Sequence, residues 1–438
     1  MSSLNIRTAQ PMTVNAAGTP VRKLTNANEA LTRVTLAHML WEDQFYVDGK
    51  TSANVMTDLV AKADPAYVAI LAEKARSEFK LRHVPLYLTR ELARTGKLKA
   101  ATLTAVIQRP DEMSEFLSIY WKDGKVPISN QVKKGLAQAF VKFNEYQLAK
   151  WDKNNSAISL RDVMFLSHAK PLNATKAELF KRVANQELKT PDTWETQLSA
   201  GADKAETFSR LMVENKLGAL AFLRNLRNMV NAGIAESTIR AYAKQLDVTK
   251  VLPFRYIAAA RIVPQFEDML EEMMLRSLEK HEKLPGKTVL LIDVSGSMFG
   301  TKVSAKSDLD RFDAAAALAI LCREICEEVE IYSFSNSTVR VSPRRGFALI
   351  EAIRDSQSHS GTATGAAVRS INANTKYDRL VIFTDEQSHD SVPKAKGLGY
   401  VINVGSYENG INRADYTTIT GFSEAVVDYI QMAEKFDK

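Results

Sequence analysis

TVLLIDVSGSM, at residues 288–298, is the stretch of sequence that decides the fold. Its first five residues are apolar or β-branched and lead to Asp293, a pattern typical of a parallel strand that is buried on both faces. Ser295 and Ser297 follow in a turn that Gly296 keeps tight. Carboxylate and hydroxyl oxygens are the ligands that a hard cation such as Mg²⁺ prefers. The stretch therefore predicts a strand that ends in a cation-binding loop.

Predicted strands and helices alternate from this stretch to the end of the chain. Strands are predicted at 330–334, 339–342, 379–384 and 400–404, and helices at 310–327, at 347–354, after 364 and at 423–436. This alternation predicts an α/β domain over residues 285–438 with a doubly wound, Rossmann-like parallel sheet. Ligands of such sheets bind at the carboxyl ends of the strands, beside the switch in strand order.

Further oxygen donors are predicted at the same edge of the sheet. Asp385 directly follows a predicted strand, as Asp293 ends the first one. Thr362 lies in the loop SGTATG at 360–365, which enters a helix. Thr364, in the same loop, is the alternative to Thr362 as the threonine of the site.

No pattern in the sequence indicates catalysis. The chain has no Gly-x-x-x-x-Gly-Lys phosphate loop and no nucleophile elbow. His359 and His389 are not spaced as an acid–base pair, and we expect both in loops near the metal face. We therefore assign no catalytic residue and expect a protein that is not an enzyme.

The N-terminal part is helical in pattern, because apolar residues recur at three- and four-residue spacing and Pro or Gly residues separate the segments. Helices are predicted at 28–42, 57–62, 67–74, 83–95, 130–142, 176–185, 208–215 and 257–280. Short helices joined in pairs predict an all-α solenoid of degenerate HEAT-like repeats over residues 26–284. A flexible arm is expected at residues 1–25.

Charge is divided unevenly between the two parts. Residues 1–284 hold 41 Lys and Arg against 31 Asp and Glu, a net charge of +10. Residues 285–438 hold 17 against 20, a net charge of −3. The basic excess therefore lies in the helical part and suggests that this part binds a polyanion.

Two features bear on the cellular compartment. No stretch approaches the roughly 20 uninterrupted apolar residues that a membrane span requires. Cys322 and Cys326 are the only cysteines, too few for a disulfide framework, and we expect both as buried thiols in a helix. We therefore expect a cytoplasmic protein that does not enter a membrane.

Asp293, Ser295, Ser297, Thr362 and Asp385 together resemble the metal-ion-dependent adhesion site of von Willebrand factor A domains. The resemblance implies that the three hydroxyls contact a metal and that the two carboxylates act largely through water. It also implies an open coordination position that takes a carboxylate from a partner protein. The expected cofactor is a divalent cation, with Mg²⁺ as the first choice.

Patches of the helical part resemble the TROVE module of the Ro autoantigen family, whose members bind Y RNAs. They are LRHVP at 81–85, ISLRDVMFLSHAKP at 158–171, AFLRNLRNMVN at 221–231 and LPF at 252–254. In that family a TROVE ring of HEAT-like helices precedes a von Willebrand A domain, which is the order found here. The chain is short for the family, which suggests a bacterial or phage-type member without the loops that elaborate animal rings.

The resemblance implies a monomeric RNA-binding ring that acts in noncoding-RNA quality control or RNA processing. Its ligands would be a Y-like RNA, bound on the rim, and single-stranded 3′ ends of misfolded RNAs, threaded through the hole. A 3′ exoribonuclease such as polynucleotide phosphorylase is a possible partner by the same resemblance. The alternative is a metal-dependent protein-interaction scaffold, in which the von Willebrand A domain docks a partner and RNA is incidental.

The RNA-binding candidates come from the matched patches. His168 aligns with a histidine associated with Y RNA binding, and an upstream lysine of the family aligns with Lys150 or, with a different gap, Lys153. The further candidates are Lys170, Arg82, His83, Arg224 and Arg227. For His168 the alternative is a role in a helix cap or packed turn. For Arg224 and Arg227 it is ordinary solvated surface charge.

Overall fold

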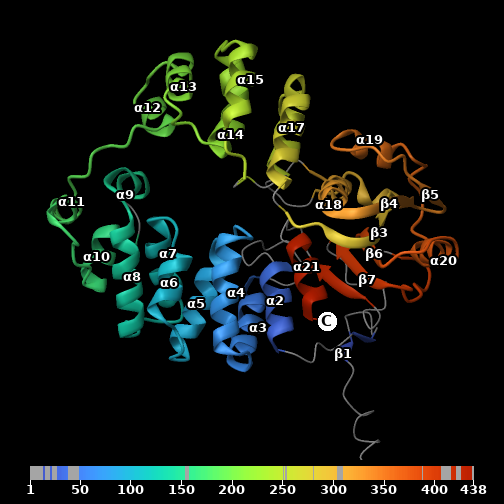
Figure 1. Ribbon diagram of the computed structural model, residues 1–438, viewed down its shortest axis with the longest axis horizontal. Coiled ribbons are helices and arrows are strands. Elements are labelled where there is room, and N and C mark those ends of the chain that lie inside the picture. Colours follow the sequence, from blue (N-terminus) through green and yellow to red (C-terminus); the bar gives the residue numbers. More distant parts are fainter. Residues whose placement is uncertain are drawn as a thin grey trace, which may run out of the picture. The chain divides into compact units, whose positions relative to one another are not determined.

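Two compact units make up the chain. The helical unit consists mainly of Ser52–Leu217, with Asn26–Thr35. The mixed unit consists mainly of Gly218–Lys438, with Met1–Thr25 and Leu36–Thr51. The computed structural model (Figure 1) describes residues 13–14, 20–21, 27–37, 49–152, 157–249, 251, 254–279, 281–302, 309–386, 388–405, 416–420 and 426–436.

The helical unit is built from short helices. They are α2 (Ala27–Ala37), α3 (Gly49–Lys62), α4 (Pro65–Ser77), α5 (His83–Arg94), α6 (Ala100–Val106), α7 (Asp111–Tyr120), α8 (Asn130–Lys142), α9 (Glu145–Trp151), α10 (Leu160–Ser167), α11 (Ala174–Asn185), α12 (Trp194–Ser199) and α13 (Lys204–Val213). Helix α4 packs on α5 and α6, α5 on α7, α6 on α8, and α8 on α10. Contacts between helices two positions apart are typical of stacked helix pairs. They support the predicted solenoid.

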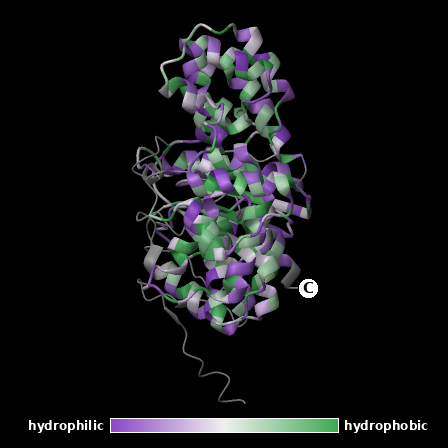
Figure 2. Ribbon diagram, turned by 90° about the vertical axis from the view of Figure 1, so that its left-hand side faces the viewer, coloured by the Kyte–Doolittle hydropathy of each residue, from purple (hydrophilic) through white to green (hydrophobic). Residues whose placement is uncertain are grey.

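Polar residues fix where many of these helices begin. A side-chain oxygen accepts a hydrogen bond from a backbone N–H of the first turn at Asp64, Ser129, Asn144, Ser159, Asn173, Thr193 and Asp203. Such caps satisfy amides that have no partner within the helix. Figure 2 shows hydrophilic and hydrophobic residues alternating along individual helices, the pattern of helices with one buried face.

Basic side chains donate hydrogen bonds to carbonyl groups at the C-terminal ends of some of these helices. Lys142, at the end of α8, donates to the carbonyl oxygens of Thr104 and Ile107 at the end of α6. Lys176 of α11 donates to the carbonyl of Phe143, just after α8. Burial lowers the pKa of both lysines. Cations at these positions satisfy free carbonyls and interact favourably with the helix dipole, so they join successive helix pairs.

Replacing Lys142 tests this linkage. Lys142→Met removes donors to two carbonyls, and we expect it to lower the free energy of unfolding by about 1–2 kcal/mol, measured by urea denaturation. Lys134→Met, at an exposed position of the same helix, is the matched control and should change stability little. Equal effects of the two substitutions would contradict a capping role for Lys142.

The mixed unit begins with helices. They are α14 (Ala219–Asn231), α15 (Glu236–Gln245), α16 (Phe254–Ile262), the 3₁₀ turn η1 (Pro264–Phe266) and α17 (Glu267–Leu278). The single helix predicted at 257–280 is wrong. Pro264 has no N–H for the helical ladder, so the chain breaks into α16 and α17 with a 3₁₀ turn between them.

A six-stranded sheet forms the rest of the mixed unit, in the order β5-β4-β3-β6-β7-β8. Its strands are β3 (Leu284–Asp293), β4 (Cys326–Phe334), β5 (Thr338–Arg340), β6 (Arg379–Thr384), β7 (Leu398–Asn403) and β8 (Thr417–Thr420). All neighbours are parallel except β4 and β5. The chain starts at the centre of the sheet with β3, runs to one edge through β4 and β5 and then to the other through β6, β7 and β8, which confirms the predicted doubly wound order. The antiparallel edge strand β5 departs from the predicted all-parallel sheet.

Helices cover this sheet. They are α18 (Arg311–Ile325), α19 (Ala348–Arg354), α20 (Thr364–Asn374) and α21 (Val426–Phe436). Helix α18 contacts β3, β6, α17 and α19, which explains why its sequence is apolar on nearly every side. Residues of α20 such as Val368 join Leu291 and Ile382 of the strands in one buried cluster. Strand β3 is thus packed between its helices and neighbouring strands at the centre of the sheet.

Other predictions are refined by the structure. Cys322 and Cys326 are buried and free, as expected, but the helix ends at Ile325 and Cys326 begins β4. Strand β8 was not predicted. The change from helix to strand occurs at Leu284, as expected, yet the compact unit already begins at Gly218.

The predicted arm at residues 1–25 lies outside the described residues except for two short strands. These are β1 (Thr13–Val14) and β2 (Pro20–Val21), which pair antiparallel. Among the helices of the described residues, none is both long and apolar enough to cross a membrane.

Candidate functional sites

The strand order places two predicted metal residues at the switch point of the sheet. Strands β3 and β6 lie side by side at its centre, and the chain runs on to β4 on one side and to β7 on the other. This reversal opens a crevice at the carboxyl ends of the two strands. Asp293 ends β3, Thr384 ends β6, and Asp385 follows at once.

Asp293 is completely buried at this edge. One carboxylate oxygen accepts a hydrogen bond from the backbone N–H of Ser295 at 2.9 Å, and the other accepts one from the Thr384 hydroxyl at 2.6 Å. Burial raises the pKa of the Asp293 carboxyl to about 7, and the nearby negative charge of Asp385 adds to the rise. Both oxygens have protein donors, which fits a carboxylate that acts on a cation through water.

The serine loop is joined to the threonine loop by backbone contacts. The hydroxyl oxygens of Ser295 and Ser297 lie 3.3 Å apart. Between them, the N–H of Gly296 donates to the carbonyl of Ser360 at 3.1 Å. The carbonyl of Thr362 in turn accepts the N–H of His389 at 2.9 Å, so this histidine lies beside the threonine loop.

Arg311 is the residue of this site that sequence reasoning missed. It is the first residue of α18, and its guanidinium donates to Asp385 Oδ2 at 2.9 Å. Its side chain is 6% exposed and that of Asp385 is 0% exposed, so the ion pair is buried. The same guanidinium lies 3.4 Å from the carbonyl oxygen of Ser297. The signal in the sequence was a basic residue at the start of a largely apolar helix.

The donor set fits a hard cation. The structure brings the five predicted residues into one connected network of strand ends and loops. Within the part of the chain that the structure describes, no group of three or more His, Cys, Asp and Glu side chains could hold a metal, so a cation here would depend on hydroxyls. Thr364 is also fully buried, and its hydroxyl has no hydrogen-bond partner among the described residues. The choice between Thr362 and Thr364 therefore stays open.

The RNA candidate Lys150 lies on an exposed, partly aromatic surface of the helical unit. Its ammonium group is 6.0 Å from the centre of the Tyr146 ring and 5.9 Å from that of Trp151. The guanidinium of Arg109 lies over the Trp151 ring at 3.6 Å. Tyr146 is 44% exposed. We call Tyr146, Lys150, Trp151 and Arg109 the aromatic–basic surface.

His168 caps a helix through its backbone and keeps its side chain exposed. It ends α10 in the left-handed conformation, with a φ of 54°, and its backbone N–H caps the helix. The capping alternative is thus correct for the backbone. The side chains of His168 and Lys170 are exposed, however, so the cap leaves the imidazole accessible.

The remaining candidates differ in whether their charged groups are already paired with acidic side chains. Arg82 forms ion pairs with Asp111 and Glu115, and burial together with the charge of Arg82 lowers the pKa of the half-buried His83. Arg224 and Arg227 are exposed on α14 and have no ion-pair partner among the residues that the structure describes. The two arginines of α14 are therefore better placed to meet phosphate than Arg82. Lys153, Leu252 and Pro253 lie outside the described residues.

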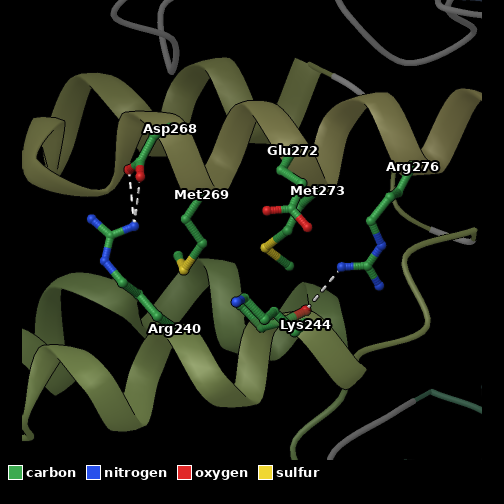
Figure 3. Close-up of a pocket in the computed structure, with 8 residues that line it drawn as sticks. Arg240, Lys244, Asp268, Met269, Glu272, Met273 and Arg276 are labelled. Atoms are coloured by element: carbon green, nitrogen blue, oxygen red, sulfur yellow. Dashed lines mark hydrogen bonds and ion pairs between the residues drawn. The ribbon is translucent and has the colours of Figure 1, made fainter.

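A pocket of about 200 Å³ lies between α15 and α17 (Figure 3). Met269 and Met273 line it, and Arg240 on its wall is paired with Asp268 at 2.9 Å. Arg276 donates to the carbonyl of Ala243. The pocket is smaller than usual ligand sites, and its arginines already have partners, so we assign it no ligand.

The hydrogen bond between Thr384 and Asp293 can be tested by substitution. Thr384→Val removes a buried donor while keeping the shape, and we expect a loss of about 1–3 kcal/mol in the free energy of unfolding. Thr384→Ser keeps the hydroxyl and should retain most of that stability. Urea denaturation followed by circular dichroism compares the three proteins, and an equal loss in both variants would speak against the hydrogen bond.

Comparisons with known proteins agree with this architecture. Residues 181–313 match the family model of the TROVE domain, a segment that includes α14 and β3 and ends within the first turn of α18. Telomerase protein component 1 of Mus musculus and that of Rattus norvegicus are 28% identical over 110 residues, which is 24% of this chain but only 4% of each relative.

The crystal structure of the Ro (Rsr) protein of Deinococcus radiodurans resembles the whole chain. The two superpose with a TM-score of 0.68 at 18% identity, covering 94% of this chain and 100% of the other. The chain thus contains a TROVE-like sequence at residues 181–313 and has the fold of a Ro protein.

Proposed function

We propose that this protein binds RNA through its helices, as a Ro-type protein. The similarity to the TROVE domain and the Ro fold support the RNA-binding role. The observation that carries the proposal further is the aromatic–basic surface, where Lys150 is exposed between Tyr146 and Trp151. It combines a charge for phosphate with rings on which bases stack, the means by which proteins hold unpaired RNA.

The ligands that fit this chemistry are RNAs with single-stranded 3′ ends and a Y-like RNA. Exposed bases of a tail can stack on Tyr146, while His168, Lys170, Arg224 and Arg227 are accessible to phosphates. We propose a non-enzymatic role in RNA quality control or processing, in the cytoplasm, by a monomeric ring. A 3′ exoribonuclease such as polynucleotide phosphorylase would then degrade or trim the RNA that the ring presents.

We further propose that the sheet part of the mixed unit is a von Willebrand factor A-type domain that binds Mg²⁺. The hydroxyls of Ser295, Ser297 and Thr362 would hold the cation, and Asp293 and Asp385 would act through water. When bound, the cation supplies an open position for a carboxylate of a partner protein. The buried Asp293 and its two hydrogen bonds keep the loop in place for this task.

The second candidate function is a metal-dependent protein-interaction scaffold, which the connected metal loops favour. It predicts a protein partner that depends on Mg²⁺ and is lost in Asp293→Ala, with RNA irrelevant. Pull-downs from native lysate with and without chelator, followed by RNA sequencing of the bound fraction, separate the two functions. Specific RNAs that remain bound in chelator and in Asp293→Ala favour the RNA-binding ring.

RNA binding can be measured with a hairpin that carries a single-stranded 3′ tail. We expect affinity to fall steeply as salt is raised, because phosphate contacts release counterions. Lys150→Ala should lower the slope of log affinity against log salt by about 1. Lys97→Ala, an equal change of charge at another exposed position of the same unit, is the control. Binding that is absent or independent of salt would refute the proposal.

Stacking on the aromatic–basic surface has its own test. Tyr146→Ala should weaken binding of the tailed hairpin by about 1–3 kcal/mol and affect a blunt hairpin much less. Tyr146→Phe keeps the ring and should bind as the unchanged protein does. Filter-binding titrations compare the two RNAs, and an equal loss for both RNAs would argue against base stacking at this position.

A further inference from the structure

We propose that Arg311 is a built-in counter-ion of the cation site, which occupies Asp385 and thereby weakens the binding of a divalent cation. The inference rests on the proposed metal site and deepens it. It concerns how a residue of the protein's own chain sets the affinity of that site for a cation. Arg311 and Asp385 are joined at 2.9 Å in a buried ion pair, so the carboxylate already has a cationic partner.

The position of Arg311 is fixed by the local structure. Asp310 caps α18, with its side chain accepting the N–H of Asp313, and this sets the first turn from which Arg311 extends. Gly405 lies close to the ion pair. A Cβ added there would be 2.5 Å from the Cβ of Asp385 and 3.4 Å from Nε of Arg311. The lack of a side chain at Gly405 leaves room for the pair.

Counting charges shows the consequence for a cation. Asp293 and Asp385 are the two carboxylates that the site offers, and Arg311 offsets one of them. In a buried site the positive charge of the guanidinium strongly repels a divalent cation, because little water screens the interaction. A bound cation would have to attract Asp385 in competition with the guanidinium, or bind beside it against repulsion. Either way, the arginine lowers affinity.

A purely structural role for Arg311 predicts the opposite result. If the guanidinium only held Asp385 in the orientation that a cation needs, its loss would weaken cation binding. The direction of the change in affinity therefore decides between a counter-ion and a positioning residue.

Titration of the full-length protein with Mg²⁺ and with Mn²⁺, by isothermal titration calorimetry, measures the effect. Arg311→Met removes the charge and roughly keeps the length of the side chain. We expect the dissociation constant of this variant for Mg²⁺ and Mn²⁺ to be lower than that of the unchanged protein by about tenfold or more. Arg311→Lys keeps the charge and should bind much as the unchanged protein does. Arg323→Met changes the net charge equally at another position of α18 and is the matched control, with no change expected.

Removal of one partner of a buried ion pair can destabilise a protein, so a second variant is needed. Arg311→Gln retains an amide donor for Asp385 but has no charge, and it too should bind the cation more tightly. Circular dichroism checks the folding of each variant. Unchanged or weaker binding in Arg311→Gln and Arg311→Met overturns the counter-ion role. If no variant binds Mg²⁺ or Mn²⁺ at all, the proposed metal site itself fails, and the RNA-binding proposal is unaffected.

Discussion

The parallel pairing of β3 with β6 is the interaction on which the rest of the mixed unit depends. It aligns Ile292 with Phe383 and so brings Asp293 beside Thr384, whose hydroxyl binds the buried carboxylate. The serine loop starts from this fixed point, and the Ser360 carbonyl holds its glycine. A change in strand register by one residue would turn these side chains to the other face, so the whole site follows from the pairing.

Helix α18 connects the sheet to the helices that precede it. It contacts β3 and β6 as well as α17, and Asp313 near its start is paired with Arg261 of α16. The helices α14 to α17 therefore belong to the same compact unit as the sheet. The TROVE match, which runs from 181 to 313, likewise passes through these helices and ends within α18. Sequence similarity and packing thus agree that the helices α14 to α17 and strand β3 form one continuous structure.

Features with a local cause could be predicted from the sequence. The apolar run of β3, the serine loop and α8 follow from neighbouring residues, and each was found where it was expected. Features that need a distant partner could not. The ion pair between Arg311 and Asp385 joins positions 74 residues apart. Arg82 was predicted to contact RNA, but in the structure its guanidinium is paired with Asp111 and Glu115. The break at Pro264 was a local signal that the longer apolar pattern concealed.

The helix-end contacts of Lys142 and Lys176 change how the basic character of the chain should be understood. Their ammonium groups are bound to carbonyls of neighbouring helices, and burial lowers their pKa. Each ammonium would have to give up these hydrogen bonds to contact a phosphate directly, so neither lysine is a free phosphate ligand. The direct contacts to the phosphates of a bound RNA would therefore come from fewer lysines than the composition suggests, namely from those whose ammonium groups are not already bound within the protein.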